Sequence, residues 1–239
     1  HVALLGKNST SWVVMFIGTI TYGATIVPIL ADFNPHDAQH IVNHSDARVL
    51  FVNSSIWETL EFEEMPELKA AVSLEMRQIL AERETEGHQM PSRIIRNLTR
   101  KFKATYPKGF RREDVVYPEI DAENTAVLNY TSGTTGFSKG VMLTYDNIAG
   151  NVNYGIASRL HYEGSRALSF LPLAHAYGCA FDMLVPLAVG TFITIFGKAP
   201  TPKLLLKAFS EVKPNLVICV PLILEKIYRK QDRKSTRLN

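Results

Sequence analysis

The sequence predicts an α/β fold in which mostly parallel sheets are flanked by helices on both faces. Short apolar segments alternate with segments of helical length along most of the chain, and glycine, proline, asparagine or aspartate separates many of them. Hydrophobic residues make up 46% of the 239 residues, which is enough to bury a substantial core. This alternation is typical of parallel sheets whose strands are joined by crossover helices.

The first part of the chain predicts four strands and two helices. An apolar helix separates the first two strands, and Asn34-Pro35 marks the start of the second helix. Asp46 and Asn53 bound the third strand. The predicted strands are Val2–Leu5, Ala24–Ile29, Arg48–Val52 and Ala70–Leu74, and the predicted helices are Ser11–Tyr22 and Asn34–His44.

The second part of the chain continues the same pattern. Apolar strands again alternate with helices, and two strands flank a loop rich in glycine and hydroxyl residues. The predicted strands are Ala126–Tyr130, Gly140–Thr144, Ala167–Leu171, Thr191–Phe196 and Leu216–Val220, and the predicted helices are Asp146–Leu160, Tyr177–Leu187 and Pro202–Val212. Right-handed crossovers place such loops at strand ends, where α/β proteins bind ligands.

Residues 58–121 interrupt the alternation. Acidic residues crowd the first half of this segment and basic residues the second. One interpretation is a solvated helical insertion; the other is a basic face that makes peripheral contact with an anionic membrane. We predict that residues 1–230 form one partial domain carrying this insertion. Residues 231–239 are polar and aperiodic, and a cloning or sequencing join would explain such a tail.

Charge and cysteine content exclude several classes of protein. The 26 basic and 23 acidic residues give a net charge of +3, which argues against nucleic-acid binding through bulk charge. Cys179 and Cys219 lie in apolar runs and form no Cys-x-x-Cys motif, so both are predicted to be buried free thiols. Free thiols fit a reducing, cytoplasmic location.

An uncharged stretch, residues 8–31, is long enough to span a bilayer. Gly18, Gly23 and Pro28 interrupt it, so a buried helix followed by a parallel strand explains it better. The chain starts at His1 inside a predicted strand, without a signal peptide, and we expect it to be truncated.

The most informative segment is the loop that joins two predicted strands, Tyr130-Thr-Ser-Gly-Thr-Thr-Gly-Phe-Ser-Lys-Gly140. Its glycines allow the backbone to approach a ligand and to point amides at it. Lys139 adds a compact positive charge, and hydroxyl donors come from Thr131, Ser132, Thr134 and Thr135. The loop therefore predicts a polyphosphate site.

Other phosphate-loop and nucleophile motifs do not fit this segment. Ser138 stands where the Walker A pattern requires glycine, and Gly140 follows the lysine in place of a hydroxyl residue. The dinucleotide fingerprint lacks a correctly spaced glycine partner. A serine-hydrolase elbow would need glycine at Tyr130.

The segment from Tyr130 to Thr144 resembles the signature loop of the adenylate-forming superfamily. Ser138 replaces the usual proline, and Tyr145 stands where histidine is frequent. Other segments resemble the long-chain fatty acyl-CoA ligases of this superfamily, and together they cover almost the whole chain: residues 2–9, Trp12, Gly23-Ala24, Val27-Pro28, Leu171-Pro-Leu-Ala-His175, Val220-Pro221 and Leu224-Glu-Lys-Ile-Tyr228.

This resemblance implies the N-terminal part of an enzyme that activates a fatty acid with Mg²⁺ and ATP and transfers the acyl group to coenzyme A. It implies that His175 orients the substrate and that Tyr177 and Gly178 line the acyl tunnel. It also implies that Lys139 offsets charge on the leaving group and that the nucleotide contacts Thr131, Ser132, Gly133, Thr134, Thr135, Gly136, Lys139 and Gly140. The family's Tyr-Gly-x-Thr-Glu segment, which serves magnesium, does not occur, so no metal ligand is assigned.

Three alternatives remain open at this stage. The first is another carboxylate-adenylating enzyme that acts on an aryl or amino acid, and the second is a non-catalytic acyl- or nucleotide-binding fragment. The third is a membrane-spanning protein anchored by residues 8–31. A hydrolytic triad of Ser132, His175 and Asp182 can also be drawn, but the nucleophile elbow is absent. His40 and His44 share a helical spacing without the zincin glutamate, so we expect a helix-surface or sheet contact from them.

Overall fold

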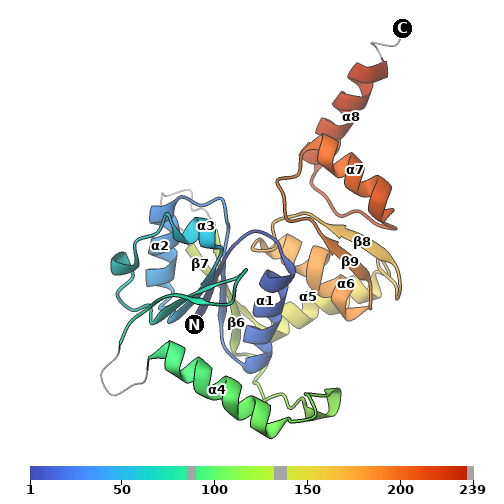
Figure 1. Cartoon of the computed structure of the whole chain (residues 1–239). Coiled ribbons are helices and arrows are strands. Elements are labelled where there is room, and N and C mark those ends of the chain that lie inside the picture. Colours follow the sequence, from blue (N-terminus) through green and yellow to red (C-terminus); the bar gives the residue numbers. More distant parts are fainter. Residues whose placement is uncertain (85–89, 132–138, 236–239) are drawn as a thin grey trace. The chain divides into compact units, whose positions relative to one another are not determined.

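The computed structural model describes residues 1–84, 90–131 and 139–235, with side chains through residue 229. These residues form two compact units (Figure 1). The first unit contains residues 1–6 and 11–145, and the second contains residues 7–10 and 146–239. Among the described residues, no helix combines the length and the hydropathy that crossing a bilayer requires.

The first unit contains a seven-stranded mixed sheet. Its strands are β1 (Val2–Leu5), β2 (Ile26–Ile29), β3 (Val49–Val52), β4 (Ala70–Ser73), β5 (Ile79–Glu82), β6 (Thr125–Thr131) and β7 (Lys139–Thr144). The helical elements are α1 (Thr10–Tyr22), α2 (Pro35–His44), α3 (Ser54–Trp57), α4 (Pro91–Thr105) and two short 3₁₀ turns, η1 (Phe62–Glu64) and η2 (Arg112–Asp114).

The strand order explains how the sequence alternation becomes a sheet. The order is β5-β4-β3-β1-β2-β6-β7, and the five central strands from β4 to β6 run parallel to one another. β5 and β7 close the two edges as antiparallel partners of β4 and β6. The parallel strands are almost entirely apolar because helices cover both of their faces.

Helices on opposite faces of the sheet complete the core of this unit (Figure 1). On one face, α2 contributes Ala38, Ile41 and Val42 to a cluster that includes strand residues Leu5 and Leu50. On the other face, Trp12 and Phe16 of α1 are fully buried and their rings stack 5.4 Å apart. Burying such large side chains is worth about 2–3 kcal/mol each.

The second unit is built around two parallel strands, β8 (Arg166–Ser169) and β9 (Phe192–Ile195). A π-helical segment, η3 (Gly178–Leu184), continues into α6 (Val185–Ala188) and connects the two strands. The remaining helices are α5 (Tyr145–Ala157), α7 (Pro202–Val212) and α8 (Pro221–Ser235). Leu168 and Phe170 pack against Leu205 and Ala208 of α7 in a small core.

The predicted fold class is confirmed, and several element predictions need correction. The segment Leu216–Val220 does not form the predicted strand. Only Leu216 pairs with a neighbour, in an isolated β-bridge to Ala167. The predicted helix Tyr177–Leu187 is mostly π-helical. The predicted polar tail contains the end of α8, which continues to Ser235. Cys179 is buried as predicted, whereas Cys219 is only half-buried. Residues 58–121 contribute β4, β5 and α4.

Candidate functional site

The predicted phosphate loop joins the paired ends of β6 and β7. The two strands are antiparallel, and their last matched pair is Thr131 with Lys139. Both residues are exposed, so the hydroxyl and the ammonium group are accessible at the end of the hairpin. The residues between them, among them Ser132, Gly133, Thr134, Thr135 and Gly136, lie outside the described part of the chain.

Tyr130 fixes the base of this hairpin to α2. Its side chain is 5% exposed, and its hydroxyl shares a hydrogen bond of 2.7 Å with Nδ1 of His44. The two rings meet edge to face, 5.7 Å apart. Burial raises the pKa of Tyr130, and the nearby charge of Asp46 raises it further, so the hydroxyl keeps its proton. Tyr130 is therefore a structural anchor beside the loop.

Gly140 leaves room for that anchor on the neighbouring strand. It pairs with Tyr130 across the hairpin. A Cβ at this position would lie 3.1 Å from Cδ1 of Leu128 and 3.3 Å from Cζ of Tyr130, closer than ordinary van der Waals contact. The glycine following Lys139 therefore has a packing role in addition to the nucleotide contact that the sequence predicts.

In the second unit, two polar side chains fix the segment that follows β8 and carries His175. The carboxylate of Asp182 accepts hydrogen bonds of 3.0 Å from the backbone N–H groups of Phe170 and Leu171. The Asn8 side chain donates to the Leu171 carbonyl at 2.7 Å and accepts from Leu173 N at 3.1 Å. Satisfied backbone groups of this kind hold an irregular segment in one conformation.

Asp182 is the most perturbed carboxyl group in the described part of the chain. Its side chain is 3% exposed, and burial raises its pKa to about 6, while the two N–H donors act in the opposite direction. Ser132 of the suggested triad lies outside the described part of the chain, and the hydrogen bonds described for the Asp182 carboxylate come from the backbone N–H groups of Phe170 and Leu171.

His175 is exposed and its ring orientation is defined locally. Its Nδ1 accepts a hydrogen bond of 3.3 Å from the backbone N–H of Tyr177. A neutral ring that accepts at Nδ1 carries its proton on Nε2. In this tautomer, the exposed Nε2 carries a hydrogen that it can donate, as the role of an orienting donor requires.

The two residues after His175 differ in environment. Tyr177 is 43% exposed, and its ring lies 5.3 Å from that of Phe181. Gly178 is buried at the start of the π-helical segment, and a Cβ there would lie 2.4 Å from the Pro172 carbonyl oxygen. Only glycine permits this close backbone approach. π-Helical segments are frequent at functional sites.

The structure brings together some of the predicted site residues. Thr131, Lys139 and Gly140 meet at the β6–β7 hairpin of the first unit, and His175, Tyr177 and Gly178 lie together in the second. Sequence reasoning missed the supporting roles of His44, Asn8 and Asp182. The spacing of His40 and His44 predicted a helix-surface or sheet contact, and His44 does contact Tyr130 of the sheet.

A comparison with protein families identifies the family to which this chain belongs. The model of a family described as AMP-binding enzyme matches residues 1–238. The chain belongs to the AMP-binding enzymes. The β6–β7 hairpin is therefore the hairpin of an AMP-binding, adenylate-forming fold, and the predicted resemblance is confirmed.

Curated relatives and solved structures of AMP-binding enzymes agree with this assignment. The chain is 30% identical to the long-chain-fatty-acid–CoA ligase ACSBG2 of Homo sapiens, over 99% of this chain and 34% of the relative. It is 27% identical to a long-chain-fatty-acid–CoA ligase of Salmonella typhimurium, over 80% of this chain and 36% of the relative. The chain thus spans about a third of the length of these relatives.

Two solved structures share the fold of this AMP-binding chain. The long-chain-fatty-acid–CoA ligase FadD1 of Archaeoglobus fulgidus superposes with a TM-score of 0.74 at 20% identity, over 97% of this chain and 42% of the other. The anthranilate–CoA ligase AuaEII, solved with anthranoyl-AMP, gives 0.71 at 24% identity, over 90% and 39%. These likenesses establish the fold alone.

Proposed function

We propose that this chain is the N-terminal, nucleotide-binding part of an ATP-dependent long-chain fatty acid–CoA ligase. The observation that carries the proposal is the β6–β7 hairpin, whose last pair is Thr131 and Lys139, on either side of a sequence of glycine and hydroxyl residues. The curated relatives named as long-chain-fatty-acid–CoA ligases support the choice of substrate.

The proposed reaction has two steps. A fatty acid carboxylate oxygen attacks the α-phosphorus of ATP, a new P–O bond forms, and the bond to the bridging oxygen breaks to release pyrophosphate. The thiol of coenzyme A then attacks the acyl carbon and AMP leaves. Two anions meet in the first step, so donors and positive charge must offset the developing charge.

In this proposal, Lys139 and the hydroxyl of Thr131 hold the β- and γ-phosphates at the end of the hairpin. The exposed Nε2–H of His175 orients the carboxylate or the α-phosphate. Tyr177 and Gly178 contribute to the wall of the acyl tunnel. Among the described residues, no three histidine, cysteine or acidic side chains gather to hold a metal. We assign none of them to Mg²⁺, which enters with ATP as part of the substrate.

The test is ATP–pyrophosphate exchange with the full-length gene product and a panel of long-chain fatty acids, aryl acids and amino acids. We expect exchange that depends on a long-chain fatty acid. We expect Lys139→Ala to slow it by about 10²–10³-fold. The matched control is Lys207→Ala, which removes an exposed lysine from α7 and should leave exchange unchanged.

Two results would redirect the proposal. Exchange that responds to an aryl or amino acid, and not to fatty acids, would favour the other carboxylate-adenylating enzymes, whose fold AuaEII shares. Binding of ATP and palmitate by calorimetry without any exchange would indicate a non-catalytic binding protein. Unchanged exchange in Lys139→Ala would show that the hairpin does not contribute to the nucleotide site.

A further inference from the structure

The helix α4 has an unusual combination of sequence and environment. It is fifteen residues long, and none of the residues from Pro91 to Thr105 is buried. Its apolar residues nevertheless follow a helical period. Ile94, Leu98 and Phe102 are four residues apart and therefore lie on one side of the helix. They are 40%, 58% and 50% exposed. We call these three residues the α4 apolar stripe.

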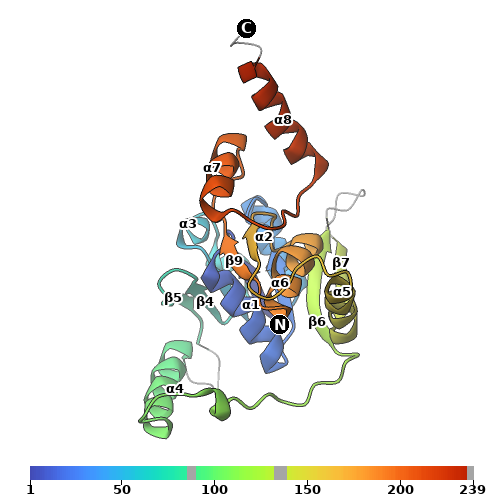
Figure 2. The same cartoon turned by 90° about the vertical axis from the view of Figure 1, so that its right-hand side faces the viewer.

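The attachment of α4 to its unit explains why the stripe is exposed. The helix lies beside β5 at the edge of the sheet (Figure 2). Its first turn is held there because the backbone N–H and the hydroxyl of Ser92 both donate to the Glu82 carboxylate at 2.7 Å. Ile95 lines a small pocket of about 220 Å³ with residues of α1, β3 and β4. The stripe does not line that pocket.

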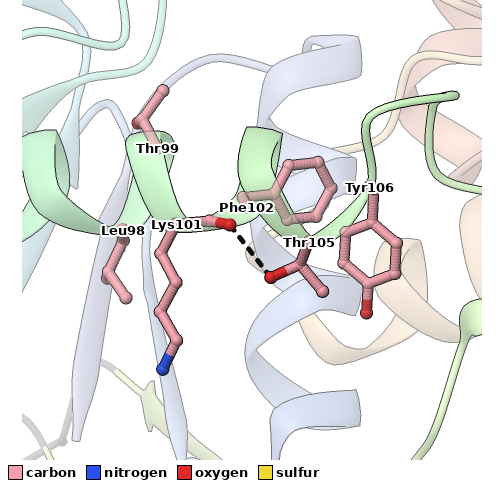
Figure 3. Close-up of a pocket in the computed structure, with 6 residues that line it drawn as sticks. All are labelled: Leu98, Thr99, Lys101, Phe102, Thr105 and Tyr106. Carbon is pink, nitrogen blue, oxygen red and sulfur yellow. Dashed lines mark hydrogen bonds between the residues drawn. The ribbon is translucent and has the colours of Figure 1, made fainter.

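Aromatic rings extend the exposed apolar surface beyond the end of α4. The Phe102 and Tyr106 ring centroids are 5.0 Å apart, and Phe110 lies 5.5 Å from Phe102 and 5.0 Å from Tyr106. Phe110 is 47% exposed. Figure 3 shows Leu98 and the Lys101 stem on one side of the pocket formed here, with Phe102 and Tyr106 on the other.

The charge of this segment is concentrated and of one sign. Residues 91–112 contain eight basic residues and no acidic one: Arg93, Arg96, Arg100, Lys101, Lys103, Lys108, Arg111 and Arg112. The rest of the chain has the other 18 basic residues and all 23 acidic ones, a net charge of −5. The positive charge of the protein is thus concentrated around the α4 apolar stripe.

We propose that α4 binds an anionic lipid bilayer, with the α4 apolar stripe inserted between the headgroups and the basic residues of the polar side attracted to the negatively charged membrane surface. An interfacial helix of this type needs a polar face rich in lysine and arginine and an opposite face with leucine and phenylalanine. On α4, Arg93, Arg96 and Arg100 lie on the side away from the stripe. Aromatic side chains with an apolar ring and a polar group, such as tyrosine, are enriched at the level of the lipid headgroups.

The charge pattern favours a bilayer over the other partners with which a basic helix can pair. A nucleic acid would be bound by the basic side chains alone and gives no reason for an apolar residue every fourth position. A second copy of this chain would present the same eight positive charges, which repel one another. Anionic lipid matches both the charges and the apolar stripe.

The test is sedimentation of the full-length protein with phosphatidylcholine vesicles, with and without phosphatidylserine. We expect binding only to the anionic vesicles, and weaker binding as salt is added. Leu98→Ala with Phe102→Ala should weaken it at least tenfold. Arg96→Gln with Arg100→Gln should weaken it by roughly thirtyfold. Because α4 buries no side chain, circular dichroism should show the same melting temperature for all variants.

Matched controls come from the second unit. Leu222→Ala removes an apolar side chain that is 57% exposed, and Lys203→Gln with Lys207→Gln removes two exposed charges from α7. Neither should change vesicle binding. Phe102→Trp gives a direct readout, since its fluorescence should shift to shorter wavelength on anionic vesicles and be quenched by brominated acyl chains.

Four outcomes would overturn the proposal. Equal binding to uncharged vesicles would remove the role of anionic lipid, and unchanged binding of the Leu98–Phe102 variant would remove the role of the stripe. A dimer in light scattering that this variant dissociates, without vesicle binding, would identify a second copy as the occupant. Binding of single-stranded RNA that prevents vesicle binding and is insensitive to the stripe would identify a nucleic-acid surface.

Discussion

His44 and Tyr130 are 86 positions apart in the chain and share a hydrogen bond of 2.7 Å between Nδ1 and the hydroxyl. This bond joins the last turn of α2 to the end of β6, directly before the predicted phosphate loop. Tyr130 is buried. Removal of its hydroxyl would leave Nδ1 of His44 without this hydrogen-bond partner.

We expect Tyr130→Phe to lower the free energy of unfolding by about 1 kcal/mol, because one part-buried hydrogen bond is lost. Urea unfolding followed by circular dichroism measures this change. Tyr154→Phe, at a 67%-exposed tyrosine of α5, is the matched control and should change stability by less than about 0.5 kcal/mol. Equal effects of the two substitutions would contradict the anchoring role.

Gly178→Ala tests the close contact between the π-helical segment and the preceding loop. The new Cβ would lie 2.4 Å from the carbonyl oxygen of Pro172, a backbone atom that cannot move alone. We expect a destabilisation of about 1–3 kcal/mol, measured by thermal or urea unfolding.

Gly150→Ala is the opposite case for comparison. Gly150 lies within α5, and apart from its chain neighbours and the backbone of its own helix, no atom of the described residues lies within 4 Å of a Cβ placed there. Alanine has a higher helix propensity than glycine, so we expect the substitution to stabilise the protein by about 0.5–1 kcal/mol. If both glycine substitutions acted in the same direction, the difference in local packing would not explain them.

The stability of the second unit should depend on pH through Asp182. Burial raises the pKa of this carboxyl from 3.8 to about 6, so the folded state holds a proton that the unfolded state has released. The resulting stabilisation is fully present below about pH 3.8 and is lost as the pH rises through 6. It amounts to on the order of 3 kcal/mol.

Asp182→Asn removes this titration while it keeps an oxygen that accepts from the Phe170 and Leu171 amides. We expect urea unfolding between pH 4 and 7 to show a flatter pH dependence for the variant than for the unchanged protein. Other carboxyl groups contribute equally to both curves, so their difference isolates Asp182. Two parallel curves would show that Asp182 does not titrate in this range.

The two cysteines should differ in reactivity. Burial raises the pKa of Cys179 to about 12, so almost no thiolate forms there at pH 8. Cys219 is half-buried, and burial together with the charge of Asp182 raises its pKa less far. Alkylation of the folded chain by iodoacetamide, mapped by mass spectrometry, should modify Cys219 first and Cys179 only after unfolding. Faster labelling of Cys179 would contradict its buried position.

His175 should be important for activity and unimportant for stability. Its ring is exposed, so His175→Ala should leave the melting temperature unchanged. In the full-length protein, we expect this substitution to slow ATP–pyrophosphate exchange by about 10²-fold, because one oriented donor is lost. Partial recovery in His175→Asn, which keeps an N–H donor, would support the proposed role. A fall in stability that parallels the fall in exchange would indicate a structural role.

The sequence was sufficient to predict the parts of the fold that repeat a simple pattern. Val2–Leu5 and Pro202–Val212 have the predicted bounds, because the first is a short continuous apolar run and the second has the apolar pattern of an amphipathic helix. Strand β5 was missed. It follows a turn in which Arg77 has a positive φ. Glycine at this position would have indicated a turn in the sequence, but arginine does not.

The limits at the candidate site have a similar physical origin. The hairpin was predictable because its motif is continuous in sequence. The contacts that hold it were not, because His44 and Tyr130 come together only through the strand order. Asn8 and Asp182 bond to backbone groups, and any residue supplies those groups, so no sequence pattern identifies their partners.

The carboxylate of Asp182 occupies two backbone amides that could otherwise bind an anion. Backbone amides at the carboxyl end of a parallel strand are a common cradle for phosphate, yet those of Phe170 and Leu171 are already taken by an acidic group of the protein itself. A phosphate at these amides would compete with the Asp182 carboxylate for both hydrogen bonds and would be repelled by its negative charge. In our proposal, the phosphates of ATP therefore bind at the lysine-bearing hairpin and not at these two amides.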